Sequence, residues 1–178
     1  LGMGDQIKKQ PNKWLEKGVK QIQKHGNHLL NLINQILDLQ KLESGTLTVE
    51  KQQGDIVPFL RSVAEQFEAF SHSKQQQLVF IPEVESLQMD HDPDKTLQIV
   101  SNLLSNAVKY TPEKGQIRLT VSEETNPYVS SETCLLIKVE DNGKGIANDR
   151  LPYIFDRFYR AETHTGTEVG TGIGLSLT

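Results

Sequence analysis

Two asparagines and a lysine stand out on an otherwise apolar stretch between residues 97 and 112. Asn102, Asn106 and Lys109 recur at helical spacing, which places them on one face of a helix as a polar row. Amide oxygens can ligate Mg²⁺ without adding charge, and a lysine ammonium can bind a phosphate. The polar row therefore fits a site for a hard cation and a phosphate chain, although solvated amides on a helix surface would give the same pattern.

A carboxylate followed by two glycines comes directly after an apolar run that is typical of a strand. These residues are Asp141, Gly143 and Gly145. A carboxylate accepts hydrogen bonds, which suits an exocyclic amine such as that of adenine. Glycines leave the backbone open to a flat ligand. A tight Asp-Asn-Gly turn that binds nothing is the alternative.

A second glycine-rich run, Gly170-Thr171-Gly172-Ile173-Gly174, leads into a predicted final helix. Free amide groups at a helix N-terminus bind phosphate. A Rossmann turn contains similar glycines, but it follows a strand. Here the preceding residues, 161–169, are polar and lack the pattern of a strand, so a dinucleotide fold is not expected.

The helix that carries the polar row is expected to be capped by Asp92, with Pro93 in its first turn. Thr111-Pro112 and Gly115 are expected to end it. Its predicted buried face has the three-and-four spacing of an amphipathic helix. That face consists of Leu97, Val100, Leu103, Leu104, Ala107 and Val108.

A second, longer helix is predicted over residues 19–44 because apolar residues alternate at steps of three and four. A helix with so wide an apolar face is not stable alone in water, and a four-helix bundle made by two hairpins from two chains would cover it. Residues 1–17 are expected to be a helix end and a connecting loop around Pro11 and Gly18. The apolar positions are Val19, Ile22, Gly26, Leu29, Leu30, Leu32, Ile33, Ile36, Leu37, Leu39 and Leu42.

The other predicted elements are shorter. Asp55 is expected to cap a helix that runs to about His72. Alternating or apolar runs predict strands at residues 46–50, 77–81, 86–89, 116–121 and 134–139, the last two as an antiparallel pair, and an aromatic turn or short helix at 153–160. The expected inward residues of the helix after Asp55 are Val57, Leu60, Val63, Ala64, Phe67 and Phe70.

Composition narrows the possible functions. Nineteen basic and twenty-three acidic residues give a net charge of -4, which argues against a nucleic-acid surface. No run approaches the roughly 20 apolar residues of a transmembrane helix. The single cysteine, Cys134, excludes an internal disulfide and fits a reducing compartment.

Four features occur in one order along the chain: the helix with the polar row, the Asp-x-Gly-x-Gly segment, the aromatic segment at 153–160 and the second glycine-rich run. That order resembles the ATP-binding catalytic domain of two-component sensor histidine kinases. The long helix resembles the second helix of the family's dimerisation and phosphotransfer hairpin. Residues 1–45 are therefore expected to be part of that hairpin, and residues 46–178 the ATP-binding domain. The sequence as a whole also resembles that of a large hybrid sensor. The N, G1, F and G2 boxes of the family would correspond to residues 102–112, 141–146, 155–158 and 170–175.

The resemblance implies an α+β fold. It would be an α/β sandwich with a mixed sheet of about five strands and three helices on one face. It also implies ATP and Mg²⁺ as cofactors. Asn106 would ligate the metal, Asn102 would lie beside the metal and the phosphates, and Lys109 would contact a phosphate. Tyr110 would lie along the adenine or ribose, and Asp141 would bind the adenine amine.

The resemblance also assigns the glycine-rich segments. Gly143, Gly145 and Ile146 would shape the adenine pocket. Arg160 would reach the phosphates from a lid, whose hinge Phe155 and Phe158 would pack without doing chemistry. The segment expected to fold over the triphosphate contains Gly170, Thr171, Gly172, Gly174 and Leu175.

One element of the family pattern is missing. No His-Glu/Asp-x-x-Thr-Pro motif occurs in the sequence. The phospho-accepting histidine is therefore expected upstream, no catalytic residue is assigned in the chain, and the chain is expected to bind ATP without phosphorylating itself. The expected partners are a second copy, through the hairpin, and the receiver domain of a response regulator, with no nucleic acid. The chain is expected to be a cytoplasmic region of a membrane-anchored sensor.

Two alternatives remain open from the sequence. Type II topoisomerases, heat-shock chaperones and mismatch-repair ATPases share such a nucleotide site, but they would lack the preceding bundle helix. A non-catalytic dimerisation or interaction module with a vestigial pocket is the other alternative. Failure to bind nucleotide would support the second.

Overall fold

The computed structural model describes residues 11–125, 133–160 and 172–178. The chain divides into two compact units, Leu1–Leu47 and Thr48–Thr178. The first contains one long helix, and the second contains two further helices, five strands and two short 3₁₀ turns in the part that is described.

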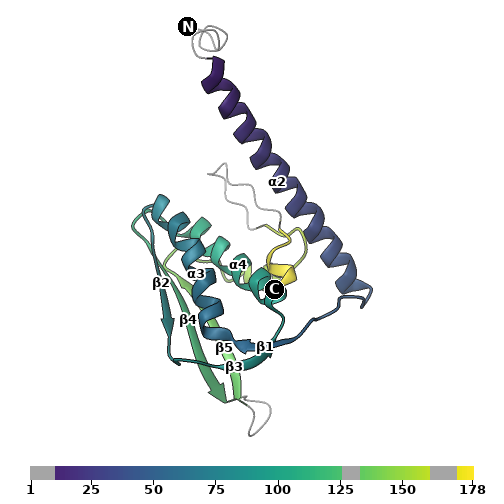
Figure 1. Cartoon of the computed structure of the whole chain (residues 1–178), viewed down its shortest axis with the longest axis vertical. Coiled ribbons are helices and arrows are strands. Elements are labelled where there is room, and N and C mark those ends of the chain that lie inside the picture. Colours follow the sequence, from purple (N-terminus) through teal and green to yellow (C-terminus); the bar gives the residue numbers. More distant parts are fainter. Residues whose placement is uncertain (1–10, 126–132, 161–171) are drawn as a thin grey trace. The chain divides into compact units, whose positions relative to one another are not determined.

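Helix α2 spans Pro11–Glu43, so the long helix is confirmed but begins earlier than predicted (Figure 1). The loop expected around Pro11 and Gly18 is wrong. Proline is tolerated in the first turn because its missing N–H would have no partner there, and a glycine inside a helix costs only about 1 kcal/mol. Many apolar side chains of α2 are exposed, for example Ile22 at 73% and Leu29 at 58%. No helix in the described residues is long and apolar enough to cross a membrane.

The strand predicted at residues 46–50 is wrong. The N–H groups of Thr46 and Leu47 both donate to the carbonyl of Lys41, at 2.9 and 3.1 Å, and so finish the helix. The first strand, β1, instead spans Gln52–Asp55 and pairs antiparallel with β3, Gln88–His91. The alternation of apolar and polar residues at 46–50 did not reveal that the helix end uses the first two N–H groups of this segment.

The other three strands form a mixed sheet in the order β2–β4–β5. Strand β2, Gln77–Pro82, runs parallel to β4, Gln116–Thr125, and β4 runs antiparallel to β5, Thr133–Asp141. Neighbouring parallel strands need a crossover connection, and the chain between β2 and β4 contains helix α4. The predicted antiparallel pair is confirmed. The described strands number five, as expected for the sheet, but they belong to two sheets.

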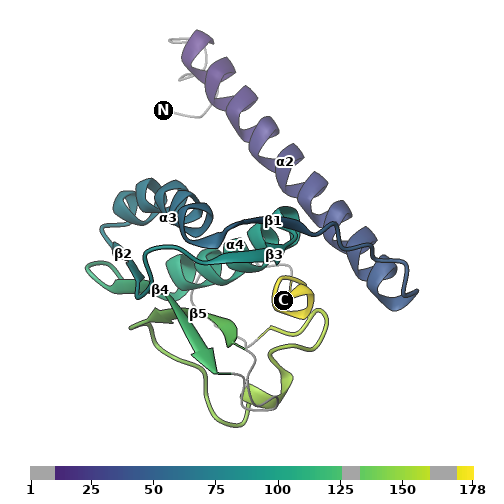
Figure 2. The ribbon, with the colours of Figure 1, turned by 60° about the horizontal axis from the view of Figure 1, so that its bottom comes forward.

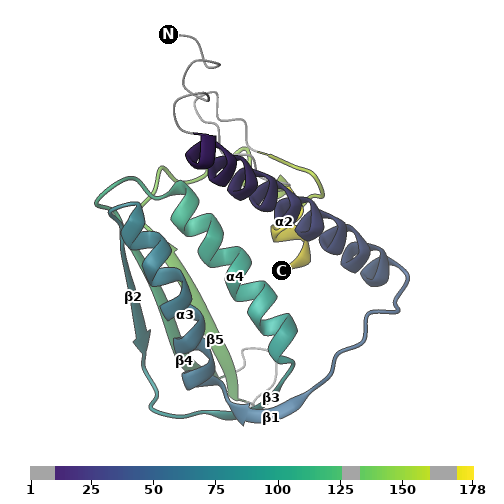
Figure 3. The same cartoon turned by 45° about the horizontal axis from the view of Figure 1, so that its top comes forward.

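Helices α3, Ile56–Ser73, and α4, Pro93–Tyr110, lie side by side on one face of the three-stranded sheet (Figures 1 and 3). Their apolar faces pack on alternate residues of β4, as the period of a strand requires. The α+β fold with helices on one face is confirmed. Phe70, expected to point inward, is 46% exposed, whereas the next residue of α3, Ser71, is buried. The core residues are Ile56, Val57, Leu60, Val63, Ala64, Leu78, Val100, Leu104, Ala107, Val108, Ile117, Leu119 and Val121.

The expected third helix is a single 3₁₀ turn in the described residues. This turn, η2, spans Leu175–Leu177 and lies beside α4 (Figure 2). Another turn, η1, spans Leu151–Tyr153, slightly before the aromatic turn predicted from the sequence. The rings of Tyr153 and Tyr159 lie 5.8 Å apart between centroids.

Candidate nucleotide site

Helix α4 carries the polar row, and its N-terminus is fixed by Asp92. One carboxylate oxygen accepts hydrogen bonds from the N–H groups of Asp94 and Lys95, at 3.0 and 3.1 Å. The other accepts from the N–H of Glu50 at 2.8 Å. The hydrogen bond from Lys95, and then that from Glu50, holds the pKa of Asp92 below its ordinary value. Asp92 therefore caps α4, as predicted, and also ties it to the segment that enters the unit.

The polar row lies at the margin of the buried face of α4. Asn102, Asn106 and Lys109 are all half-buried, whereas Leu104 and Val108 are fully buried on the core side. The Nδ2 group of Asn102 donates to the carbonyl oxygen of Gly174 at 3.1 Å. The polar row thus contacts the second glycine-rich segment, although the two are far apart in the sequence. Leu97, expected to be buried, is 37% exposed, whereas Val100, three residues later, is fully buried.

The turn after β5 brings Asp141, Gly143 and Tyr110 together. The N–H of Gly143 donates to Oδ1 of Asp141 at 2.8 Å. A Cβ atom added to Gly143 would lie 2.6 Å from that oxygen and 2.6 Å from the carbonyl oxygen of Tyr110. Since real side chains do not tolerate such distances, only glycine fits between the end of α4 and the Asp141 turn. Asp141 itself is exposed, so its second oxygen is open to a ligand.

Two residues of this turn, Asn142 and Lys144, were not assigned a role from the sequence. The side-chain oxygen of Asn142 accepts from the N–H of Gln116 at 2.8 Å, and its own N–H donates back to the Gln116 carbonyl at 3.2 Å. The Asp-Asn-Gly pattern was the available signal for this anchor. The ammonium groups of Lys109 and Lys144 lie 5.0 and 5.7 Å from the centroid of the Tyr110 ring. These distances are typical of cation–π interactions. The position of Lys144 between two glycines did not predict its contact with the Tyr110 ring.

The remaining predicted residues of the first glycine segment are open to solvent. Gly145 has a φ of +68°, and a Cβ added to it would meet no atom within 4 Å. Ile146 is 45% exposed. Ile146 therefore has room for a ligand beside it but makes no part of the described core.

The aromatic segment and the second glycine segment meet in one contact. The N–H of Phe158 donates to the carbonyl of Gly172 at 2.8 Å. Both residues have left-handed backbones, with φ of +61° and +71°, and a Cβ on Gly172 would lie 2.7 Å from the Phe158 carbonyl carbon. The rings of Phe155 and Phe158 are 60% and 62% exposed. The contact therefore joins the two segments through the backbone, not through the phenylalanine rings.

The remaining residues predicted for the nucleotide site are Arg160, Leu175, Gly170 and Thr171. Arg160 is exposed, and Leu175 is half-buried beside α4. Gly170 and Thr171 lie outside the described residues. No group of three or more histidine, cysteine, aspartate or glutamate side chains that could hold a metal occurs in the part of the chain that the structure describes.

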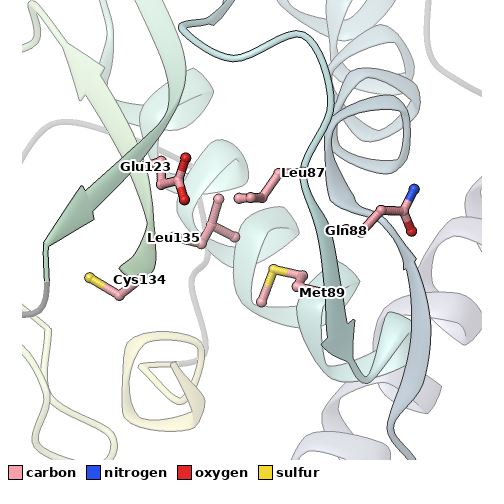
Figure 4. Close-up of a pocket in the computed structure, with 6 residues that line it drawn as sticks. All are labelled: Leu87, Gln88, Met89, Glu123, Cys134 and Leu135. Atoms are coloured by element: carbon pink, nitrogen blue, oxygen red, sulfur yellow. The ribbon is translucent and has the colours of Figure 1, made fainter. Parts of the chain in front are cut away.

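A small hollow of about 130 Å³ lies elsewhere in the same unit (Figure 4). Cys134 and Leu135 at the start of β5 form one side of it, whereas Asp141 is at the other end of that strand. The hollow is therefore separate from the candidate nucleotide site. Its lining residues are Leu87, Gln88, Met89, Glu123, Cys134 and Leu135.

The fold and the sequence match known proteins. Residues 91–178 match the family of histidine kinase-, DNA gyrase B- and HSP90-like ATPases. The chain is 31% identical over 160 residues to histidine kinase P4 of Formosa agariphila, covering 88% of this chain and 11% of that protein. It is 34% identical over 158 residues to the sensor histidine kinase WalK of Bacillus subtilis, covering 87% and 24%. The solved structure of full-length ShkA in complex with AMPPNP has a TM-score of 0.74 and 28% identity, over 91% of this chain and 32% of that chain.

Fold and sequence thus place residues 91–178 among the ATPases of this family. Within it, the chain belongs to the sensor histidine kinases. The chain spans 11% and 24% of the length of the two curated relatives named above.

Proposed function

We propose that this chain binds ATP between α4, the Asp141 turn and the segment after Gly172, and supplies it for phosphoryl transfer to a histidine. Asp141 receives the adenine amine, with Gly143, Gly145 and Ile146 around the base and Tyr110 along the adenine or ribose. Lys109 and Arg160 contact phosphates, and Asn102 lies beside them. The residues proposed to contact the triphosphate from the second glycine-rich segment are Gly170, Thr171, Gly172, Gly174 and Leu175.

The observation that carries the proposal is the close approach of Tyr110, Asp141 and Gly143. The Gly143 N–H occupies one carboxylate oxygen at 2.8 Å. The exposed carboxylate can still accept a hydrogen bond from an amine, but it cannot donate one. A base with an exocyclic amine is therefore favoured over a base that presents a carbonyl at the same place. This supports selection of adenine over guanine.

Magnesium fits the same site only together with the nucleotide. Mg²⁺ is commonly bound by few protein oxygens with substrate phosphates and water. Asn106 is half-buried on the polar row, and its amide oxygen would be the protein ligand. When bound, the metal would neutralise phosphate charge, while Lys109 and the glycine amides hold the phosphates in place.

The exposed apolar side of α2 supports the assignment of Leu1–Leu47 to a dimerising hairpin. Leu30 and Leu37 are 59% and 47% exposed, and a helix of this kind gains stability by packing in a bundle. The full protein would then be a homodimer that passes the phosphoryl group from its histidine to a receiver domain. Placement of this region at the cytoplasmic side of a membrane-anchored sensor is part of the same proposal.

Calorimetric titration of the purified chain with ATP, GTP and ADP, with and without Mg²⁺, tests the proposal. ATP should bind more tightly than GTP, and Asp141→Asn should weaken ATP by about 10- to 100-fold, because a charged acceptor is lost. Asp90→Asn, an exposed change on β3, is the matched control and should bind as the parent does. Asn106→Ala should chiefly remove the effect of Mg²⁺.

Two results would count against the proposal. Equal affinity of the parent for ATP and GTP would contradict the role of Asp141. No nucleotide binding by a well-folded chain would favour a non-catalytic dimerisation module with a vestigial pocket.

A further inference from the structure

Helix α4 ends beside the candidate site with carbonyl groups that the helix itself cannot satisfy. The carbonyl of Val108 would normally accept from the N–H of residue 112, but Pro112 has none. The carbonyl of Ala107 is satisfied by the N–H of Thr111 at 3.0 Å. The carbonyls of Val108 and Thr111 therefore need donors from outside α4.

Gln76 supplies these donors from the turn between α3 and β2. Its Nε2 group donates to the carbonyl of Val108 at 3.1 Å and to that of Thr111 at 2.5 Å. Gln76 is only 6% exposed. Lys74 also reaches the Val108 carbonyl, at 3.4 Å, but Gln76 is the described side-chain donor to Thr111. Because both partners are acceptors, the amide must present its NH₂ group to them.

The turn that carries Gln76 is itself held in place. Its neighbour Gln75 has a φ of +57°, and the Gln75 carbonyl accepts from the N–H of Lys114 at 2.8 Å. On the other side, the N–H of Gln77 donates to the carbonyl of Gly115 at 2.9 Å. Backbone hydrogen bonds thus hold the residues on both sides of Gln76, so its side chain is held at a fixed position relative to the end of α4.

The arrangement around Gln76 leaves two buried oxygen atoms unpaired within the described part of the chain. The Oε1 atom of Gln76 and the Oγ1 atom of Thr111 are both buried with no hydrogen-bond partner among the described residues. An unpaired buried polar atom is costly, so the two hydrogen bonds that Gln76 provides are accompanied by a local cost in stability. Local features that cost stability are typical of functional sites.

We infer that Gln76 is a positioning residue for the nucleotide site. The two carbonyls it holds flank Lys109 and Tyr110, and the Tyr110 carbonyl lies against Gly143 at the Asp141 turn. Gln76 thereby fixes the end of α4 relative to the carboxylate proposed to read adenine. The expected effect of Gln76 on ATP affinity rests on the proposed function, whereas its expected effect on the position of Gly143 does not.

The test compares Gln76→Met, which removes the donors and the unpaired oxygen, with Gln77→Glu as a control. Gln77 is exposed, and its side-chain oxygen accepts from Gln116 at 3.3 Å, a role that glutamate can keep. Three quantities are measured on each folded chain: stability to urea, hydrogen exchange of the Gly143 amide, and affinity for ATP and inosine triphosphate, which lacks the amine.

Gln76→Met removes both hydrogen bonds of the Nε2 group. It should raise Gly143 exchange by about tenfold and weaken ATP binding by about tenfold. Its preference for ATP over inosine triphosphate should fall as well, whereas Gln77→Glu should change none of these. Gln76→Asn, which keeps the amide on a shorter side chain, gives a second variant and should be intermediate.

The inference is overturned if folded Gln76→Met keeps the parent's Gly143 exchange, or if it changes only the stability to urea. A parent chain that does not distinguish ATP from inosine triphosphate would instead contradict the proposed function. In that case the Gly143 exchange still decides the role of Gln76.

Discussion

The side-chain amide of Asn102 donates a hydrogen bond to the carbonyl oxygen of Gly174 at 3.1 Å. This bond joins the polar row of α4 to the second glycine-rich segment. Gly174 also accepts from the Thr178 hydroxyl at 3.0 Å and from the Leu177 N–H at 3.3 Å. Gly174 is thus the point at which the last turn of the described chain is attached to α4.

Asn102→Ala should therefore loosen the segment around Gly174. The loss of one hydrogen bond with a partly buried acceptor should cost about 1 kcal/mol. Asn102→Asp should cost more, because a carboxylate would face a carbonyl oxygen. Hydrogen exchange of the Leu177 amide, measured in both variants, checks the prediction. Ser105→Ala, on an exposed part of α4, is the control, and equal Leu177 protection in all chains would contradict it.

The glycines of the Asp141 turn should differ in what they tolerate. Gly143→Ala forces a Cβ to within 2.6 Å of the Tyr110 carbonyl, and overpacking of this kind costs about 1–3 kcal/mol. Gly145 has open space but a left-handed backbone. Asparagine enters that conformation more readily than other residues, so Gly145→Asn should be nearly neutral.

Urea unfolding and ATP titration of Gly143→Ala, Gly143→Asn and Gly145→Asn check this difference. Both changes at Gly143 should lower stability and ATP affinity together, since they displace Asp141 from Tyr110. If Gly143→Asn were as well tolerated as Gly145→Asn, the close approach would not exist in solution.

Stability should fall in acid through the two capping aspartates. The hydroxyl of Ser86 and then the N–H of Leu87 hold the pKa of Asp55 below its ordinary value, as the N–H of Lys95 does for the pKa of Asp92. The unfolded carboxyl groups have a pKa of about 3.9. A lowered folded pKa adds stability above that value, and this gain is lost as the pH falls through the folded pKa.

The urea midpoint, followed from about pH 6 down to about pH 2, measures this loss. The Asp55→Asn and Asp92→Asn chains should be less stable near neutral pH and should lose less on acidification than the parent. Asp90→Asn, with an exposed side chain, should follow the parent curve. Parallel curves for all four chains would show that the caps carry no pH dependence.

Two leucines on the same face of α4, seven residues apart, should respond differently to truncation. Leu104 is fully buried, whereas Leu97 is 37% exposed. Leu104→Ala should cost about 2–5 kcal/mol because it removes core contacts and leaves a cavity. Leu97→Ala should cost about 1 kcal/mol or less. Equilibrium unfolding of both variants checks this difference in burial along the helix, and similar losses would mean that Leu97 is buried as deeply as Leu104.

Much of this protein could be predicted from local sequence. Asp55 and Asp92 were expected to cap helices because their carboxylates can accept from free N–H groups, and both do so. The apolar spacing of α4 predicted its buried face, since Val100, Leu104 and Val108 are fully buried. The order of the glycine-rich segments predicted the family. These features depend on residues close together in the chain.

Only the tertiary structure decided which distant groups meet. The strand expected at residues 46–50 does not form: the N–H groups of Thr46 and Leu47 bind the end of α2, and that of Glu50 binds the carboxylate of Asp92. Local alternation does not reveal such competition. The pairing of Gln76 with the end of α4 and of Gly143 with Tyr110 also joins residues far apart in sequence. Sequence spacing fixes which face a residue is on, whereas packing decides what that face touches.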